Sequence, residues 1–337
     1  MNATPDRRIV VITGASSGIG KAAAVRFAAD GQHVILACRD PQRGRRALQQ
    51  VIDASGSRAV ELLRVDVASF DSVRRFCDAF RAAHDRLDTL IHNAGYFEHG
   101  LRTYQTSPDG LELTFATNVF GPLLMTELLL DRLQRSADAR VLWASSTNIK
   151  NFFDPKREIQ FDNLRGEHRA DRPYSVYRMY GDSKMGQILL TRRMAEVYAP
   201  LGIRVNAIMI PATRVEKATL RKFHSWYRVL GLIVQNLNPW ALAPEQIAAC
   251  YHRICTAPEC GGVTGALIDR DLEILRPLET GRPLSPAATL RELRHPRHTP
   301  PYADDPANIE RMWRLAREVI DPALEAAGDA PATARRL

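Results

Sequence analysis

The chain has 337 residues, of which 45% are hydrophobic and 25% are charged, so it can bury a sizeable core and its main body does not resemble a disordered chain. Its formal net charge of +8 comes mostly from arginines spread along the sequence, which favours anionic ligands. Because the sequence has no zinc-finger spacing and no stripe of lysines and aromatic residues, we do not expect it to bind nucleic acid.

Apolar strands alternate with helices through most of the sequence. Strands are predicted at residues 7–14, 33–39, 59–67, 88–95, 140–146, 203–210 and 265–269. Helices are predicted at residues 21–31, 45–56, 72–84, about 111–133, about 177–198, about 244–255 and near 308–320. Because such alternation is typical of parallel sheets, we expect an α/β fold: a single Rossmann-type doubly wound parallel sheet over residues 1–275, with helices on both faces.

Three segments interrupt this alternation. Residues 147–176 form an insertion rich in charged and aromatic residues, and residues 212–243 are apolar with basic residues interspersed. Residues 276–337 are a C-terminal extension rich in proline and arginine. We expect this extension to be loop or poorly ordered up to its last helix.

The five cysteines do not have the spacing of common zinc sites, so free thiols in a reducing compartment are the preferred interpretation. No apolar run is long enough for a signal peptide or for a segment that spans a bilayer. These features predict a cytoplasmic protein without a metal site.

The turn between the first strand and the first helix carries Gly14, Gly18 and Gly20. Glycines at such a turn let the backbone approach a pyrophosphate, while the helix N-terminus supplies N–H groups and a partial positive charge. The pattern is not a P-loop, because Ala15 and Ala22 stand where that motif needs a glycine and a hydroxyl. A glycine turn without a ligand is the alternative, but the flanking strand and helix favour a dinucleotide site.

The residue after the second strand selects between the two nicotinamide dinucleotides. An acid there binds the 2′-hydroxyl of NAD, whereas an arginine accommodates the 2′-phosphate of NADP. Arg39 holds this position, with Asp40 beside it and Arg43 close by. The two arginines favour NADP(H) over NAD(H), because a guanidinium binds phosphate well. The neighbouring acid keeps NAD open, and a solvated surface charge is the alternative interpretation of Arg39.

The chain carries five motifs, in this order: TGASSGIG (13–20), HNAG (92–95), TNVFGPLLMTELLL (117–130), VLWASS (141–146) and YGDSK (180–184). With this ordered set, the sequence resembles the short-chain dehydrogenase/reductase superfamily from residue 8 to about residue 270. LACRDPQRG (36–44) and NLRGE (163–167) are similar to its retinol-dehydrogenase-like branch. YGDSK is also similar to the protochlorophyllide reductases of that branch.

The resemblance implies a catalytic set of four residues. Tyr180 is the implied proton donor or acceptor at the substrate oxygen, and Lys184 would hold the nicotinamide ribose and lower the pKa of the phenol. Ser146, with Ser145 as the alternative, would donate a hydrogen bond to the substrate oxygen, and Asn118 would hold a water relay behind the lysine.

Elementary chemistry supports the pair in YGDSK. A spacing of four residues places Tyr180 and Lys184 on one face of a helix. A nearby ammonium favours the phenolate of a tyrosine, which otherwise titrates near pH ~10. The other two residues have ordinary alternatives: Ser146 could cap the strand end, and Asn118 could be a polar residue bonded to the backbone.

The resemblance also implies a set of residues in contact with the dinucleotide. These are Gly14, Ser16, Ser17, Gly18, Ile19, Gly20, Arg39, Asp66, Val67, Asn93, Ala94, Gly95, Lys184, Pro211 and Thr213. For Asp66, a helix N-cap is the alternative. The sequence departs from the family pattern at His92, which we interpret as a core residue bonded to the backbone. It departs again at Ala212 and Glu216, where the family has glycine and often threonine.

Residues 217–240 combine large apolar and aromatic side chains with lysines and arginines. In the family that the chain resembles, this region covers the substrate, so an apolar lid implies a sizeable hydrophobic carbonyl or alcohol. Two alternatives are peripheral contact with an anionic membrane surface and plain packing, including a contact between copies in a homo-oligomer. The insertion at 147–176 would help to wall the same site.

Our primary hypothesis is an NADP(H)-dependent oxidoreductase that interconverts a carbonyl and an alcohol on a small hydrophobic substrate, with Tyr180 as general acid/base. Reduction of a carbon–carbon double bond in a pigment or polyketide-type precursor is the second enzymatic hypothesis. A dinucleotide-binding sensor without turnover is the third, and the intact set of catalytic residue types argues against it.

Overall fold

The computed structural model describes residues 7–165, 167–168, 170–214, 241–278, 285–294, 297–326 and 328. Within these ranges, seven parallel strands form one sheet in the order β3-β2-β1-β4-β5-β6-β7. The strands are β1 (Ile9–Thr13), β2 (His33–Cys38), β3 (Val60–Arg64), β4 (Thr89–His92), β5 (Ala139–Ser146), β6 (Ile203–Ile210) and β7 (Leu267–Ile268). The predicted doubly wound parallel sheet is confirmed: β6 has its predicted bounds, β5 begins one residue earlier than predicted, and the other five strands are shorter than predicted.

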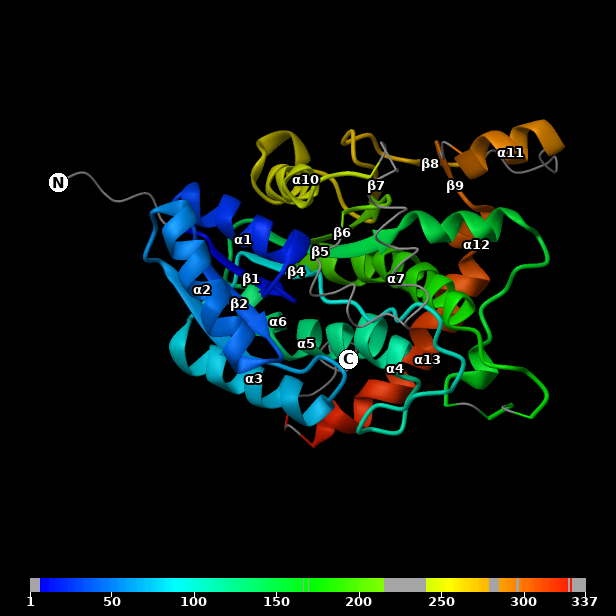
Figure 1. Cartoon of the computed structure of the whole chain (residues 1–337), viewed down its shortest axis with the longest axis horizontal. Helices are drawn as coiled ribbons and strands as arrows, with labels where there is room; N and C mark the ends of the chain where they lie inside the picture. Colours follow the sequence, from blue (N-terminus) through cyan, green and yellow to red (C-terminus); the bar gives the residue numbers. More distant parts are fainter. Residues whose placement is uncertain are drawn as a thin grey trace.

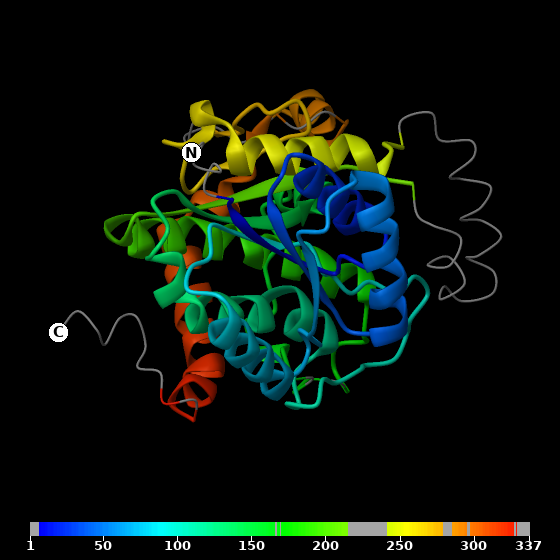
Figure 2. The same cartoon turned by 90° about the vertical axis from the view of Figure 1, so that its left-hand side faces the viewer.

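Helices cover both faces of the sheet (Figure 1). One face packs against α1 (Gly18–Ala29), α2 (Pro41–Ser55) and α10 (Pro244–Thr256). The other packs against α3 (Phe70–Ala83), α5 (Gly121–Leu128), α7 (Val176–Tyr198) and α13 (Pro306–Glu325). Figure 2 shows these layers from a second side, with α10 on one face and α3 on the other.

The strand order reverses direction between β1 and β4. From β1 the chain builds outward through β2 and β3, then returns to β4 on the other side of β1. In open parallel sheets, ligands bind outside the carboxyl ends of the strands at such a switch point. The glycine turn follows β1 there, and Asn93 follows β4.

The predicted long helix at 111–133 is broken, which corrects the sequence prediction. It consists of α4 (Leu113–Phe115), a π-helical turn η1 (Ala116–Phe120), α5 and α6 (Leu130–Leu133). Gly121, at the start of α5, lies very close to Val67, which follows β3. A Cβ at Gly121 would be 1.7 Å from the carbonyl oxygen of Val67. Pro122 follows and has no N–H to donate. The π turn, which contains Asn118, accommodates this close approach.

The C-terminal extension is more ordered than the sequence suggests. The region expected to be loop contains β8 (Arg276–Pro277) paired with β9 (His298–Thr299), and helices α11 (Pro286–Arg294) and α12 (Pro301–Asp304). Prolines begin these helices instead of preventing them, since a proline at the first helical position loses no hydrogen bond. The last helix, α13, buries Met312 and Trp313 in the core beside α5 and α7.

The insertion is largely irregular, as expected, with two short 3₁₀ helices, η2 (Thr147–Phe153) and η3 (Phe161–Asn163). Two more 3₁₀ turns lie at η4 (Ala199–Leu201) and η5 (Pro258–Cys260). All five cysteines are free thiols, as predicted. Within the described ranges, no helix has both the length and the apolar character needed to cross a bilayer.

Candidate active site

The glycine turn and the end of β4 interlock at the switch point. Gly14 has a φ of +68°, and a Cβ there would lie 2.9 Å from the Cα of Ala94. A Cβ at Gly20 would lie 2.5 Å from Nδ2 of Asn93. The hydroxyl oxygen of Thr13 accepts hydrogen bonds from the N–H groups of Asn93 and Ala94, both at 3.0 Å. Only glycine allows the turn to approach Asn93 and Ala94 this closely. The packing against these two residues therefore explains why Gly14 and Gly20 are glycines.

The start of α1 leaves room for an anion. Ser17 is the N-cap of α1, but its side chain makes no capping hydrogen bond. Gly18 has a φ of +54°, and a Cβ there would meet no atom within 4 Å. A helix N-terminus whose N-cap side chain makes no capping hydrogen bond suits the pyrophosphate of a dinucleotide. The residues present therefore fit the predicted cofactor.

The end of β2 clarifies the roles of the neighbouring arginines and acid. Asp40 is the N-cap of α2, and its Oδ1 accepts from the N–H groups of Gln42 at 2.8 Å and Arg43 at 3.0 Å. The hydrogen bond from the Arg43 backbone lowers the pKa of Asp40. Arg43 also reaches the glycine turn, with its guanidinium 3.4 Å from the hydroxyl of Ser17. Arg39 is exposed directly after β2, so the guanidinium of Arg43 lies at the turn while the acid caps a helix.

Asp66 and Val67 follow β3. Asp66 accepts from the N–H of Ala68 at 3.1 Å and donates its own N–H to the hydroxyl of Ser72 at 2.9 Å. The N-cap of α3 is Ser69, not Asp66. The helix-cap alternative for Asp66 is therefore wrong, and its contact with a dinucleotide stays a prediction.

The catalytic pair predicted from YGDSK lies on one face of α7. Nζ of Lys184 is 5.4 Å from the ring centroid of Tyr180. Lys184 is buried, and its Nζ donates to the carbonyl oxygen of Ala144 in β5 at 2.7 Å. Burial lowers the pKa of Lys184 to about 7. The amine is thus held between the sheet and the tyrosine, where its charge is costly.

Burial has the opposite effect on the tyrosine. It raises the pKa of Tyr180 above its ordinary value of 10, and a hydrogen bond with Ser146 acts in the lowering direction. The predicted acidification of the phenol is therefore not achieved by the protein groups alone, because desolvation outweighs them.

The two serines of β5 have different surroundings. Ser146 engages Tyr180 and accepts from the N–H of Asn148 at 3.3 Å. Ser145 is turned inward and donates to the backbone carbonyl of Lys184 at 3.2 Å. This geometry favours Ser146 over Ser145 as the residue that faces a substrate.

Asn118 joins three elements around the lysine. Its Oδ1 accepts from the N–H of Tyr96 at 2.7 Å, and its Nδ2 donates to the hydroxyl of Ser183 at 3.0 Å. Its backbone carbonyl accepts from Nε2 of Gln187 at 2.8 Å. The water relay that the resemblance implies behind the lysine stays a prediction. Gln187 was not predicted, although its position three residues after Lys184 places it on the same helical face.

An aromatic group that was not predicted from the sequence lies against the ring of Tyr180. The ring of Phe97 stacks on the ring of Tyr180, with centroids 4.4 Å apart. Phe97 also makes edge contacts with the rings of Tyr177 and His99, and Nδ1 of His99 is 3.2 Å from the hydroxyl of Tyr177. Tyr177 is 49% exposed, so this group lies where the site opens to solvent. Tyr177 could have been found from its spacing, three residues before Tyr180 on α7.

A buried ion pair fastens the insertion to the catalytic helix. Arg157 pairs with Asp182, and its guanidinium also donates to the carbonyl of Arg178 at 3.2 Å. Burial raises the pKa of Asp182 to about 6, although the charge of Arg157 acts against this. Asp182 is fully buried and lies two residues after Tyr180. The insertion is thus held against α7 beside the catalytic tyrosine.

The departures from the family pattern are partly explained. His92 is buried, its Nε2 is 2.7 Å from the hydroxyl of Thr126, and burial lowers its pKa to about 3. The core role predicted for His92 is confirmed, but its partner is a side chain and not the backbone. Pro211 and Thr213 follow β6, where Thr213 forms a parallel bridge with Leu242. Of the predicted lid, residues 215–240 lie outside the described residues.

Comparisons with known proteins find relatives of this chain in sequence and in fold. Residues 8–153 match the family model for short chain dehydrogenase. The chain is 32% identical to Dehydrogenase/reductase SDR family member 13 of Bos taurus, over 96% of this chain and 76% of that protein. It is 33% identical to Retinol dehydrogenase 14 of Homo sapiens, over 77% of this chain and 76% of that protein. In fold it is similar to an uncharacterized protein from Mycobacterium Paratuberculosis, with a TM-score of 0.62, 24% identity and 93% of each chain covered.

Proposed function

The chain belongs to the short-chain dehydrogenase/reductase family and is an NAD(P)-dependent enzyme of that family; from that premise we propose that it interconverts a carbonyl and an alcohol on a hydrophobic substrate with NADP(H). In this proposal Tyr180 is the general acid/base. The observation that carries it is the placement of Tyr180, Ser146 and Lys184 together at the carboxyl edge of the sheet, next to the glycine turn.

Each catalytic residue has one task. The hydroxyl of Tyr180 gives a proton to the substrate oxygen during reduction and takes it back during oxidation. Ser146 donates a hydrogen bond to the same oxygen as negative charge develops there. Lys184 holds the nicotinamide ribose, and its charge stabilises the phenolate whenever it is protonated. The bound dinucleotide supplies or accepts the hydride.

The preference for NADP(H) rests on two arginines, one at the glycine turn and one directly after β2. Arg43 already contacts Ser17, and Arg39 is exposed after β2. Asp40 supports this preference, because both N–H bonds to its Oδ1 commit the carboxylate to capping α2. Oδ1 is therefore not available to the 2′-hydroxyl that an acid at this position binds in NAD.

An apolar substrate is supported by the surroundings of the tyrosine and by the relatives. The group of Phe97, Tyr177 and His99 offers aromatic surface at the opening of the site. Retinol, named in Retinol dehydrogenase 14, is a large apolar alcohol. Aromatic side chains bind such molecules by burying apolar area and by stacking.

The test is NADPH oxidation with a panel of apolar aldehydes, ketones and enones, with Tyr180→Phe beside the wild type. Tyr302→Phe is the matched control, because Tyr302 lies in α12 and its hydroxyl accepts from the N–H of Ile159, outside the site. We expect Tyr180→Phe to lose at least ~100-fold in kcat with NADPH binding retained, since general acid catalysis contributes about 10²–10⁴-fold. Turnover in the wild type with enones alone would instead favour double-bond reduction. Equal rates for the two variants would disprove the assignment of Tyr180.

A further inference from the structure

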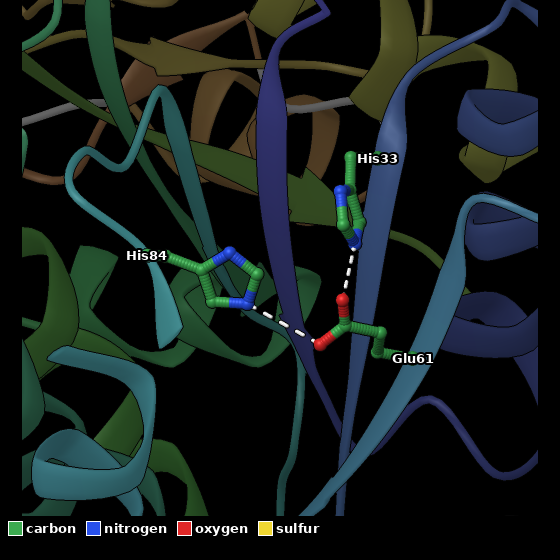
Figure 3. A group of neighbouring side chains, drawn as sticks. All are labelled: His33, Glu61 and His84. Atoms are coloured by element: carbon green, nitrogen blue, oxygen red, sulfur yellow. Dashed lines mark hydrogen bonds and ion pairs between the residues drawn. The ribbon is translucent and has the colours of Figure 1, made fainter. Parts of the chain in front are cut away.

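Two histidines and a glutamate lie close together at the amino ends of the strands, and the glycine turn lies at the opposite, carboxyl ends. Figure 3 shows the three side chains. Nε2 of His33 is 2.8 Å from Oε1 of Glu61, and Nε2 of His84 is 3.3 Å from Oε2 of Glu61. The three ligand-type atoms all lie within 4.8 Å of one another. Within the described part of the chain, this is the one group of at least three His, Cys, Asp or Glu residues that is close enough to hold a metal ion.

Three separate elements supply these side chains. His33 begins β2, Glu61 is the second residue of β3, and His84 directly follows α3 as its C-cap. In the sheet register, Glu61 pairs with Ile35, two residues after His33. Since side chains two residues apart on a strand share a face, His33 and Glu61 project from the same face of the sheet. The fold itself therefore brings the three groups together.

We propose that His33, Glu61 and His84 form a binding site for a divalent metal ion of the zinc type. Two imidazole nitrogens and one carboxylate oxygen are a donor set that zinc uses with water as the fourth ligand. Ligand atoms around a tetrahedral zinc lie roughly 3.3 Å apart, given metal–ligand bonds of about 2.0–2.2 Å. Small side-chain rotations bring the three atoms to that separation.

The charges and exposure of the cluster also suit a cation. The carboxylate of Glu61 pairs with two imidazoles, and within the described chain no other basic side chain forms an ion pair with it. Among the described residues, no arginine forms an ion pair with this carboxylate, although the protein carries an excess of arginine. The side chain of His33 is 27% exposed and that of Glu61 is 41% exposed, so solvent reaches two of the three ligands. His84 is buried and packs against the ring of Phe80, so one ligand is already held in place.

The site is structural and takes no part in hydride transfer. It lies at the amino ends of β2 and β3, whereas Arg39 and the glycine turn lie at the carboxyl ends. A metal there would join β2, β3 and the end of α3, and would stabilise the folded chain in proportion to its occupancy. The inference is therefore independent of the proposed function.

The experiment uses the full chain purified without a polyhistidine tag and stripped with a chelator. ZnCl₂ is titrated by calorimetry, CoCl₂ is followed by visible absorption, and thermal unfolding is recorded with and without ZnCl₂. We expect one zinc per chain, a visible band typical of four-coordinate cobalt, and a rise in Tm of about 4 °C at a hundredfold excess over Kd.

Variants assign the ligands. Glu61→Gln and His33→Asn should each weaken zinc binding by roughly 100-fold and abolish the rise in Tm. The matched control is His298→Asn. Nδ1 of His298 is 2.8 Å from Oε1 of Glu292, and this carboxylate pairs with one imidazole instead of two. If Glu61→Gln does not fold, zinc binding by His33→Asn decides the outcome, because His33 is partly exposed and its replacement should be tolerated. Absence of zinc binding in the wild type, or equal binding by His33→Asn and His298→Asn, would overturn the proposal and leave a hydrogen-bonded cluster only.

Discussion

Nζ of Lys184 lies 5.4 Å from the ring centroid of Tyr180, and the same nitrogen donates to the carbonyl of Ala144 at 2.7 Å. Both side chains leave one face of α7, and β5 closes the other side of the amine. An ammonium in this position has little water around it, so the geometry that serves the reaction is unfavourable for the folded protein. Removing this amine should therefore improve stability and harm the reaction.

Replacement of Lys184 by methionine should stabilise the protein while abolishing activity. Burial lowers the pKa of Lys184 from 10.5 to about 7, so between these values the unfolded chain holds a proton that the folded chain lacks. This difference makes the stability rise with pH across that window, and the full penalty is present below about pH 7. Lys184→Met removes the penalty, and we expect a gain of about 2 kcal/mol in the free energy of unfolding at pH 7.

The measurement is urea unfolding of the wild type and Lys184→Met at several pH values from 6 to 10. The advantage of the variant should be largest at the acid end and shrink as pH rises. An advantage that does not change with pH would show that lost packing, and not the titration of the amine, separates the two proteins. Lys150→Met is the control, because Lys150 lies in the insertion, away from this pair.

Charge at the end of β2 should decide the choice of dinucleotide. Replacing both Arg39 and Arg43 by glutamine removes the guanidinium group beside Ser17 and the exposed one directly after β2. Because a hydrogen bond to a charged group contributes about 1.5–3 kcal/mol, NADPH should bind roughly 10- to 100-fold more weakly, with little change for NADH. The measurement is fluorescence titration with both dinucleotides. Asp40→Asn is the control, since asparagine also caps a helix; an equal loss for NADPH and NADH in the arginine variant would contradict the prediction.

The sequence predicts the sheet well because its strands are buried on both faces and carry near-continuous apolar runs. It predicts the Tyr180–Lys184 pair because a fixed spacing on one helix needs no tertiary information. Phe97 and Arg157 could not be predicted, since each meets α7 only after the chain folds and neither has a local signal. The broken helix around Asn118 was missed for a similar reason: its cause is the approach of Gly121 to Val67, which is 54 positions earlier in the chain.

A single methyl group at Gly20 should disrupt the dinucleotide site. Its Cβ would lie 2.5 Å from Nδ2 of Asn93 and 2.8 Å from the carbonyl oxygen of Gly14. One of these contacts is backbone, so the turn itself must move, at a cost of about 1–3 kcal/mol. We expect Gly20→Ala to bind NADPH at least ~10-fold more weakly and to unfold at lower temperature. Gly262→Ala is the control, because a Cβ there meets no atom within 4 Å; similar losses in both variants would show that the effect is not local.

The buried pair of Arg157 and Asp182 should govern substrate binding without touching the cofactor. Asp182→Asn keeps the shape of the side chain but leaves the guanidinium of Arg157 buried without a counter-charge. Burial raises the pKa of Asp182 to about 6, so Asp182→Asn also relieves the cost of desolvating a charge, which offsets the loss of the counter-charge. We therefore expect only a small change in the free energy of unfolding, as for Asp162→Asn in the exposed pair with Arg172, which should cost at most about 1 kcal/mol. Because the pair fastens the insertion to α7 beside Tyr180, we expect Asp182→Asn to raise KM for the carbonyl substrate while Kd for NADPH is unchanged. Steady-state kinetics and a binding titration separate the two effects, and a matching rise in both constants would mean that the variant loosens the whole site and not the wall alone.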